Sequence, residues 1–83
     1  MKIIKSVKVE YISATGEPVF VQRVVGVRVA LSPTIKSLRI RWAGGAGGTF
    51  RVYCSKEDGT LSVVHIPQHR IVDVFIEYMK EAR

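Results

Sequence analysis

Three arginines and a tyrosine are the residues whose types and spacing point to chemistry. Arg39, Arg41, Arg51 and Tyr53 each stand between apolar residues, in two segments separated by a glycine-rich stretch. Because side chains alternate between the two faces of a strand, pairing these segments would place all four on one face. Like charges directly opposite one another destabilise a sheet, so three arginines there suggest that an anion lies between them. Guanidinium groups bind phosphate through forked hydrogen bonds, and Arg and Tyr both stack on bases. We therefore predict a nucleic-acid-binding surface at these four residues.

Further basic residues extend this prediction. Lys8, Arg28 and Lys36 are placed on the same surface, although their positions depend on a strand order that the sequence does not give. The alternative is an ordinary solvated sheet face, because arginine stems also cover apolar surface without binding anything.

The glycine-rich stretch and the tryptophan before it have two interpretations each. Trp42 alternates with core positions, which favours a buried ring, but next to a flexible loop it could serve as a stacking platform. The glycines are a hairpin connection or, alternatively, a place where backbone N–H groups approach phosphate closely. No Lys-Ser or Lys-Thr pair follows them, so the stretch is not a Walker-type loop. The glycines concerned are Gly44, Gly45, Gly47 and Gly48.

Metal-dependent and catalytic functions are not expected. Cys54, His65 and His69 are three soft ligands, whereas a structural zinc site needs four. Cys54 shares a face with apolar residues, where a cysteine is normally unreactive packing. No carboxylate pair is placed for acid–base work, so the sequence predicts neither an enzyme nor a cofactor.

Length, composition and charge set the wider limits. The chain has 83 residues, of which 47% are hydrophobic, and a formal net charge of +6. Residues 1–54 hold nine of the thirteen Lys and Arg but two of the seven Asp and Glu, which favours a polyanion partner for this part. No apolar run approaches the roughly 20 residues of a membrane span. One cysteine and no secretory signal predict a reducing location, in the cytoplasm or on the nucleoid.

Most of the chain has a β pattern. Residues 3–13 and 19–31 are expected to be strands, the second with a bulge or bend near Gly26, followed by strands on either side of the glycines. A hairpin is predicted at residues 56–60, Lys56-Glu57-Asp58-Gly59-Thr60. A two-residue Asp58-Gly59 loop is one register. We prefer a type I turn with a G1 bulge, because it pairs Phe50 with Ile66, Val52 with Val64 and Arg51 with His65 and keeps one face apolar.

Residues 68–82 are predicted to form a helix that Pro67 opens. Asp73 and Glu77 would form a narrow polar stripe on it, and the remaining apolar arc is wider than one sheet face needs. One hypothesis is that this helix forms a homodimer interface in addition to intramolecular packing; the alternative is that both flanks of the helix are buried within one chain. The dimer residues predicted are Val72, Phe75, Ile76 and Met79.

These patterns predict one domain over residues 1–83, with strands over about 2–66 and one C-terminal helix. The expected fold is β-rich α+β: a small curled antiparallel sheet, or an SH3- or OB-like barrel, of five or six strands. The expected function is largely sequence-independent binding of DNA or RNA through the phosphate backbone. The alternative is an assembly module that dimerises and has no nucleic-acid role.

Overall fold

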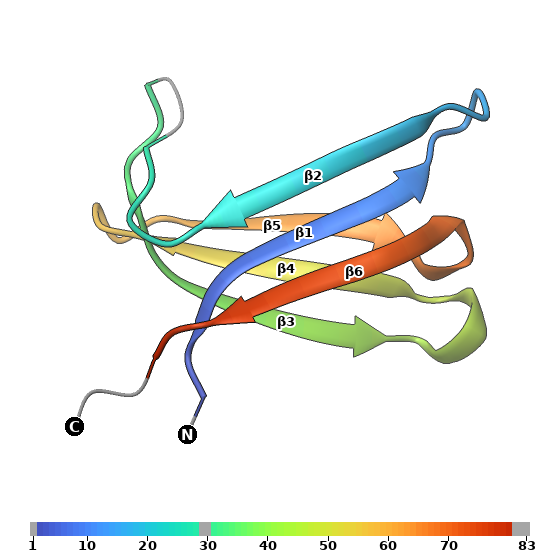
Figure 1. The fold of residues 1–83 in the computed structure, drawn as a ribbon. Coiled ribbons are helices and arrows are strands. Elements are labelled where there is room, and N and C mark those ends of the chain that lie inside the picture. The colour runs from blue at the N-terminus through green and yellow to red at the C-terminus, as the bar shows by residue number, and fades with distance from the viewer. Residues whose placement is uncertain (1, 29–30, 81–83) are drawn as a thin grey trace.

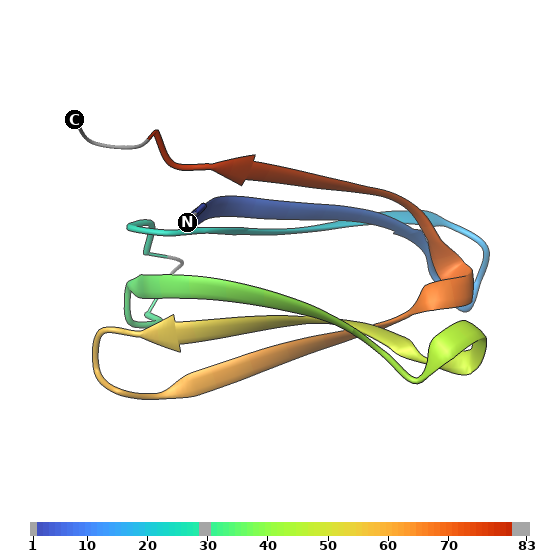
Figure 2. The same ribbon diagram turned by 90° about the horizontal axis from the view of Figure 1, so that it is seen from below.

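The computed structural model describes residues 2–28 and 31–80 as two antiparallel three-stranded sheets. One sheet has the order β2-β1-β6 and the other β3-β4-β5, and the two lie as separate layers (Figures 1 and 2). The strands are β1 (Ile4–Ile12), β2 (Pro18–Val24), β3 (Ile35–Ala43), β4 (Thr49–Lys56), β5 (Leu61–Pro67) and β6 (Ile71–Tyr78). Two short 3₁₀ turns, η1 (Gly45–Gly47) and η2 (Gln68–Arg70), lie at one end of the molecule.

The core lies between the two sheets and is built by alternation along the strands. Val7 and Val9 of β1 face Phe50 and Val52 of β4, and all four are almost wholly buried. Residues between them point outward, as the period of two requires. Cys54 is fully buried in this core, as its pattern predicts. Among the residues described, the buried apolar ones are Val7, Val9, Ile35, Leu38, Phe50, Val52, Cys54 and Ile66.

The hairpin between β4 and β5 has the predicted bulged register. Phe50 pairs with Ile66, and Arg51 pairs with His65. The Lys56 N–H donates to the Thr60 carbonyl oxygen at 2.9 Å, and Gly59 has a φ of +87°. A left-handed glycine that closes a three-residue loop is the G1 bulge expected from Asp58-Gly59.

The predicted C-terminal helix is wrong: residues 71–78 form strand β6. Val74 and Ile76 pair with Val9 and Val7 and face the core, whereas Asp73, Phe75 and Glu77 face outward. Two features of the segment explain the error. A spacing of four residues between Asp73 and Glu77 suits one face of a strand as well as one face of a helix. The β-branched residues of the segment also favour a strand. Residues 81 and 82, the end of the predicted helix, lie outside the described part of the chain.

The barrel prediction is also wrong, because the two sheets remain separate and neither closes on itself.

The predicted strand over 19–31 ends at Val24, and residues 29–30 lie outside the described residues. The bend expected near Gly26 is present: Gly26 has a φ of +82°, and its N–H donates to the Ile35 carbonyl oxygen at 2.9 Å. The chain thus leaves the first sheet at Val24 and enters the second at Ile35. Across the residues described, no helix is long and apolar enough to cross a membrane.

Candidate nucleic-acid interface

The outer face of the β3-β4-β5 sheet carries a row of basic side chains. Arg41 pairs with Arg51, and Arg51 pairs with His65, so one residue from each strand contributes to this row. All three alternate with residues that pack inward, which fixes them on the solvent side. The prediction that Arg41 and Arg51 share one face is therefore confirmed.

The adjacent row on the same face is Arg39, Tyr53 and Val63. The guanidinium carbon of Arg39 lies 5.6 Å from the centroid of the Tyr53 ring, within cation–π range. Arg39, Ile40, Arg41 and Tyr53 line a shallow depression of about 230 Å³. We call the five residues Arg39, Arg41, Arg51, Tyr53 and His65 the basic face. Two guanidinium groups and a phenol at one depression provide both charge and a stacking surface.

No carboxylate balances this charge among the described residues. The remaining outward positions on these strands hold neutral residues such as Ser37, Thr49 and Ser55. Over residues 2–28 and 31–80, the one ion pair within 4.0 Å joins Lys5 to Glu77, on the other sheet. Arg51 donates through Nε to the Thr49 hydroxyl at 3.2 Å, which orients its guanidinium without neutralising it. The positive charge is therefore available to an external anion.

Of the three further basic residues predicted for this surface, Lys8 and Arg28 do not lie on the outer face of the β3-β4-β5 sheet. Lys8 is on the outer face of the β2-β1-β6 sheet, with its Nζ 4.9 Å from the Phe20 ring centroid and 5.9 Å from that of Phe75. Arg28 lies in the β2–β3 connection, at a depression that Glu57 and Asp58 also line. Lys36 is exposed on β3, at an irregularity just before the basic residues begin. The extended surface predicted from sequence thus reduces to the basic face, because the register shift at Lys36 does not assign that residue to the row of Arg39 and Arg41.

Trp42 is neither buried nor on the basic face. It pairs with Phe50 on the inner side of β3, and the two ring centroids are 4.4 Å apart. Trp42 is nevertheless 55% exposed as a residue, because it lies near the end of an edge strand. The expectation of a core tryptophan is wrong, although its assignment to the inner face is correct. Trp42 therefore points away from the arginines and does not supply a stacking surface beside them.

Local geometry accounts for several glycines of the β3–β4 connection. Gly44 and Gly45 have φ of +86° and +61°, and a Cβ on Gly48 would lie 1.7 Å from the Ala43 carbonyl oxygen. The Gly48 carbonyl oxygen accepts from the Gln68 N–H at 3.0 Å, which attaches the loop to η2. The glycines therefore close a compact turn. Their approach to phosphate stays a prediction.

His65 is a residue that the sequence argument leaves out of the site. The hairpin register already places it opposite Arg51 on the solvent side, and that pairing is the signal that could have included it. His65, His69 and Cys54 do not gather: no group of three or more metal-ligating side chains occurs among the residues described.

Three of the predicted dimer residues lie on β6, an edge strand, and the fourth, Met79, follows the strand's last residue, Tyr78. Val72, Phe75 and Met79 are exposed, whereas Ile76 faces the core opposite Val7.

Comparison of the chain with protein-family models, curated proteins and solved structures found no match.

Proposed function

We propose that this protein binds nucleic acid through the basic face and contacts mainly the phosphate backbone. The observation that carries the proposal is the pairing of Arg41 with Arg51 on one face, with no carboxylate of the described residues near them. Placing two guanidinium groups opposite each other costs free energy in the absence of an anion. A phosphate between them would turn this repulsion into two charge-assisted hydrogen-bonded contacts.

Binding through this surface is expected to depend little on sequence. A sheet presents arginines to the backbone more readily than to base edges, and backbone contacts carry no sequence information directly. Tyr53 adds one stacking surface beside Arg39, which would favour an accessible base of a single strand. A net charge of +6 supports association with a polyanion over a wide surface.

The test is a fluorescence-anisotropy titration with a labelled 20-mer as duplex DNA, single-stranded DNA and RNA at several salt concentrations. The triple variant Arg39→Gln/Arg41→Gln/Arg51→Gln removes three charges from the basic face. The control Lys5→Gln/Lys8→Gln/Arg28→Gln removes three charges elsewhere, so both variants have the same net charge. We expect the first variant to reduce the slope of log K against log salt by about three and the control to leave most of the affinity.

Two results would overturn the proposal. One is the absence of binding to any of the three oligonucleotides at about 50 mM salt, where backbone contacts are strong. The other is an equal loss of affinity in both triple variants, since net charge alone would then explain the binding.

A second candidate function is assembly through β6. This strand pairs with β1 on one side only. Val72, Phe75 and Tyr78 are exposed along it, and Met79 is exposed just after its end. An exposed edge with apolar side chains is suited to pairing with another strand, and a second copy of β6 would extend the sheet to six strands. Sedimentation equilibrium at micromolar concentration tests this: Val72→Lys should convert a dimer to a monomer, and a wild-type monomer would exclude it.

A further inference from the structure

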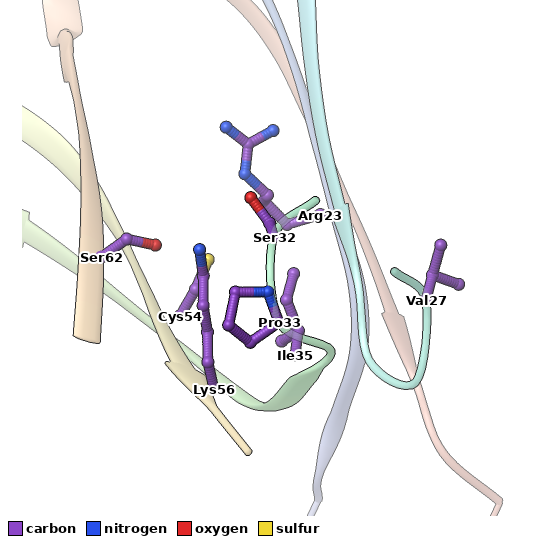
Figure 3. A pocket seen from close by; sticks show the side chains of 8 residues that line it. All are labelled: Arg23, Val27, Ser32, Pro33, Ile35, Cys54, Lys56 and Ser62. Carbon is purple, nitrogen blue, oxygen red and sulfur yellow. The ribbon is translucent and has the colours of Figure 1, made fainter. Parts of the chain in front are cut away.

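A pocket of about 280 Å³ opens between the two sheets, at the end of the sandwich where β2 and β4 finish. It lies between the layers and is distinct from the basic face, which is on the outside of one sheet. Its polar lining consists of Arg23, Ser32, Lys56 and Ser62, and its apolar lining of Val27, Pro33, Ile35 and Cys54 (Figure 3).

The inward positions of three strands change from apolar to polar at this end. Along β2, Val21 is followed inward by Arg23, which pairs with buried Val7. Along β4, the next residue after buried Cys54 that points inward is Lys56. Along β5, the inward residue before Val64 is Ser62, and it pairs with Cys54. The simultaneous change on three strands builds a polar chamber against an apolar core.

The polar atoms of this chamber converge on one opening. Figure 3 shows the Lys56 ammonium group and the hydroxyl groups of Ser62 and Ser32 turned toward the same space, with the Arg23 guanidinium at its rim. Arg23 is held there because its Nη1 donates to the Gln22 carbonyl oxygen at 2.8 Å. Hydroxyl groups, an ammonium and a guanidinium can all donate hydrogen bonds to one acceptor.

The charge of this chamber is positive and uncompensated within it. No lining residue is acidic, and no ion pair involves Arg23 or Lys56 within the described segments. The Thr60 hydrogen bonds and, to a smaller extent, the Lys56 charge lower the pKa of Asp58, which is not among the residues that line the pocket. The Asp58 Oδ1 is already occupied outside the pocket, where it accepts from the Thr60 backbone N–H at 2.9 Å and hydroxyl at 2.6 Å.

We propose that this pocket binds a small phosphate monoester whose phosphate lies between Arg23 and Lys56 and whose apolar body lies against Pro33 and Ile35. A phosphate of charge about −2 matches the two cations and offers several acceptors to the serine hydroxyls. The volume limits the body to a small group, since ligand pockets for drug-sized molecules begin near 300 Å³. The inference goes beyond the proposed nucleic-acid function and does not rest on it.

The experiment is an NMR titration of the full chain with phenyl phosphate, inorganic phosphate, benzoate and phenol, following backbone amide shifts. We expect saturable amide shifts at Ile35, Lys56 and Ser62 with phenyl phosphate. Inorganic phosphate and benzoate should bind with lower affinity, and phenol should give no saturable shifts. The double variant Arg23→Gln/Lys56→Gln should lower the affinity for phenyl phosphate by about tenfold or more, since it removes two charge-assisted contacts. The control Arg39→Gln/Arg41→Gln should stay within about twofold of wild type, because it leaves the pocket intact.

Several outcomes would overturn the pocket proposal. They are the absence of saturable shifts with wild-type protein, shifts confined to the basic face, equal response to phenol and phenyl phosphate, and unchanged affinity in Arg23→Gln/Lys56→Gln. The wild-type shift map decides the question even if the double variant fails to fold. Failure here leaves the oligonucleotide titration unaffected, because that titration depends on arginines of the other sheet face.

Discussion

Arg41 lies directly opposite Arg51 in the antiparallel register of β3 and β4, with both side chains on the solvent side of the sheet. Arg39, two residues away, lies instead opposite Tyr53 and close to its ring. The same sheet face therefore holds one repulsive pair and one attractive pair. This difference makes the two arginines a matched set for testing whether the surface is suited to an anion.

Arg41→Gln is expected to stabilise the protein at low salt when no anion is bound. The substitution removes the repulsion from Arg51 and keeps a long side chain on the sheet, so the free energy of unfolding should rise by about 0.2–1 kcal/mol. Arg39→Gln is the control and should be neutral or slightly destabilising, because it removes the contact with Tyr53. Urea unfolding at ~10 mM and ~1 M salt measures both, and the Arg41 effect should vanish at high salt, where the screening length is about 3 Å. A loss of stability in Arg41→Gln at low salt would contradict the repulsion.

Gly48→Ala is expected to disrupt the turn between β3 and β4. The added Cβ would overlap the Ala43 carbonyl oxygen, so the backbone must shift, and we expect a loss of about 2 kcal/mol or more. Gly47→Ala is the matched control, because a Cβ there meets nothing within 4 Å. Thermal unfolding followed by circular dichroism compares the two. Equal losses would mean that the close approach at Gly48 does not decide the turn.

Phe50→Ala is expected to remove a large part of the total stability. Phe50 is fully buried between the sheets, and truncation of such a residue costs about 3–5 kcal/mol. A chain of this size has about 4–12 kcal/mol in all. Phe20→Ala is the control, because Phe20 is 55% exposed and contacts Lys8; it should cost less than about 1 kcal/mol. Denaturant unfolding midpoints of the two variants measure the two losses of stability. Similar losses at both sites would show that Phe50 is not a central residue of the core.

The pKa of Asp58 is expected to depend on Thr60. Hydrogen bonds from the Thr60 hydroxyl and backbone N–H are the largest causes that lower this pKa below its ordinary value of 3.8. Thr60→Val removes the hydroxyl and should raise the pKa, whereas Thr60→Ser should keep it low. A carbon-detected NMR titration of the Asp58 carboxyl group measures the shift in each variant. An unchanged pKa in Thr60→Val would assign the effect to the backbone instead.

The lowered pKa of Asp58 also fixes the sign of a stability change with pH. Folding favours the deprotonated carboxylate, so the contribution is complete above the ordinary pKa of 3.8 and is lost as the pH falls through the lower folded-state value. Unfolding measured between pH 5 and 2 should therefore show a smaller acid-induced loss in Thr60→Val than in wild type. A larger loss in the variant would contradict this sign.

The local sequence pattern was sufficient to predict which residues share a face in the β3-β4-β5 sheet. Alternation alone assigned Arg39, Arg41, Arg51 and Tyr53 to one face, since the period of two is a property of any extended chain. The Asp58-Gly59 turn left two registers for the second hairpin, and the requirement that one face stay apolar selected the correct one, with Phe50 opposite Ile66. Strands joined by short connections need no long-range information to pair.

The tertiary structure decided what depends on residues far apart in sequence. Whether residues 71–78 form a helix or a strand depends on β1, which supplies the partner edge and, through Val7 and Val9, the core against which Val74 packs. The same partition into two layers put Lys8 on the face remote from Arg41 and directed Arg23 and Lys56 into one pocket. The spacing of residues along the chain determines only on which face of its own strand each side chain lies. Which side becomes the interior, and which strands share it, is set by burial of apolar surface between segments that meet only in the folded state.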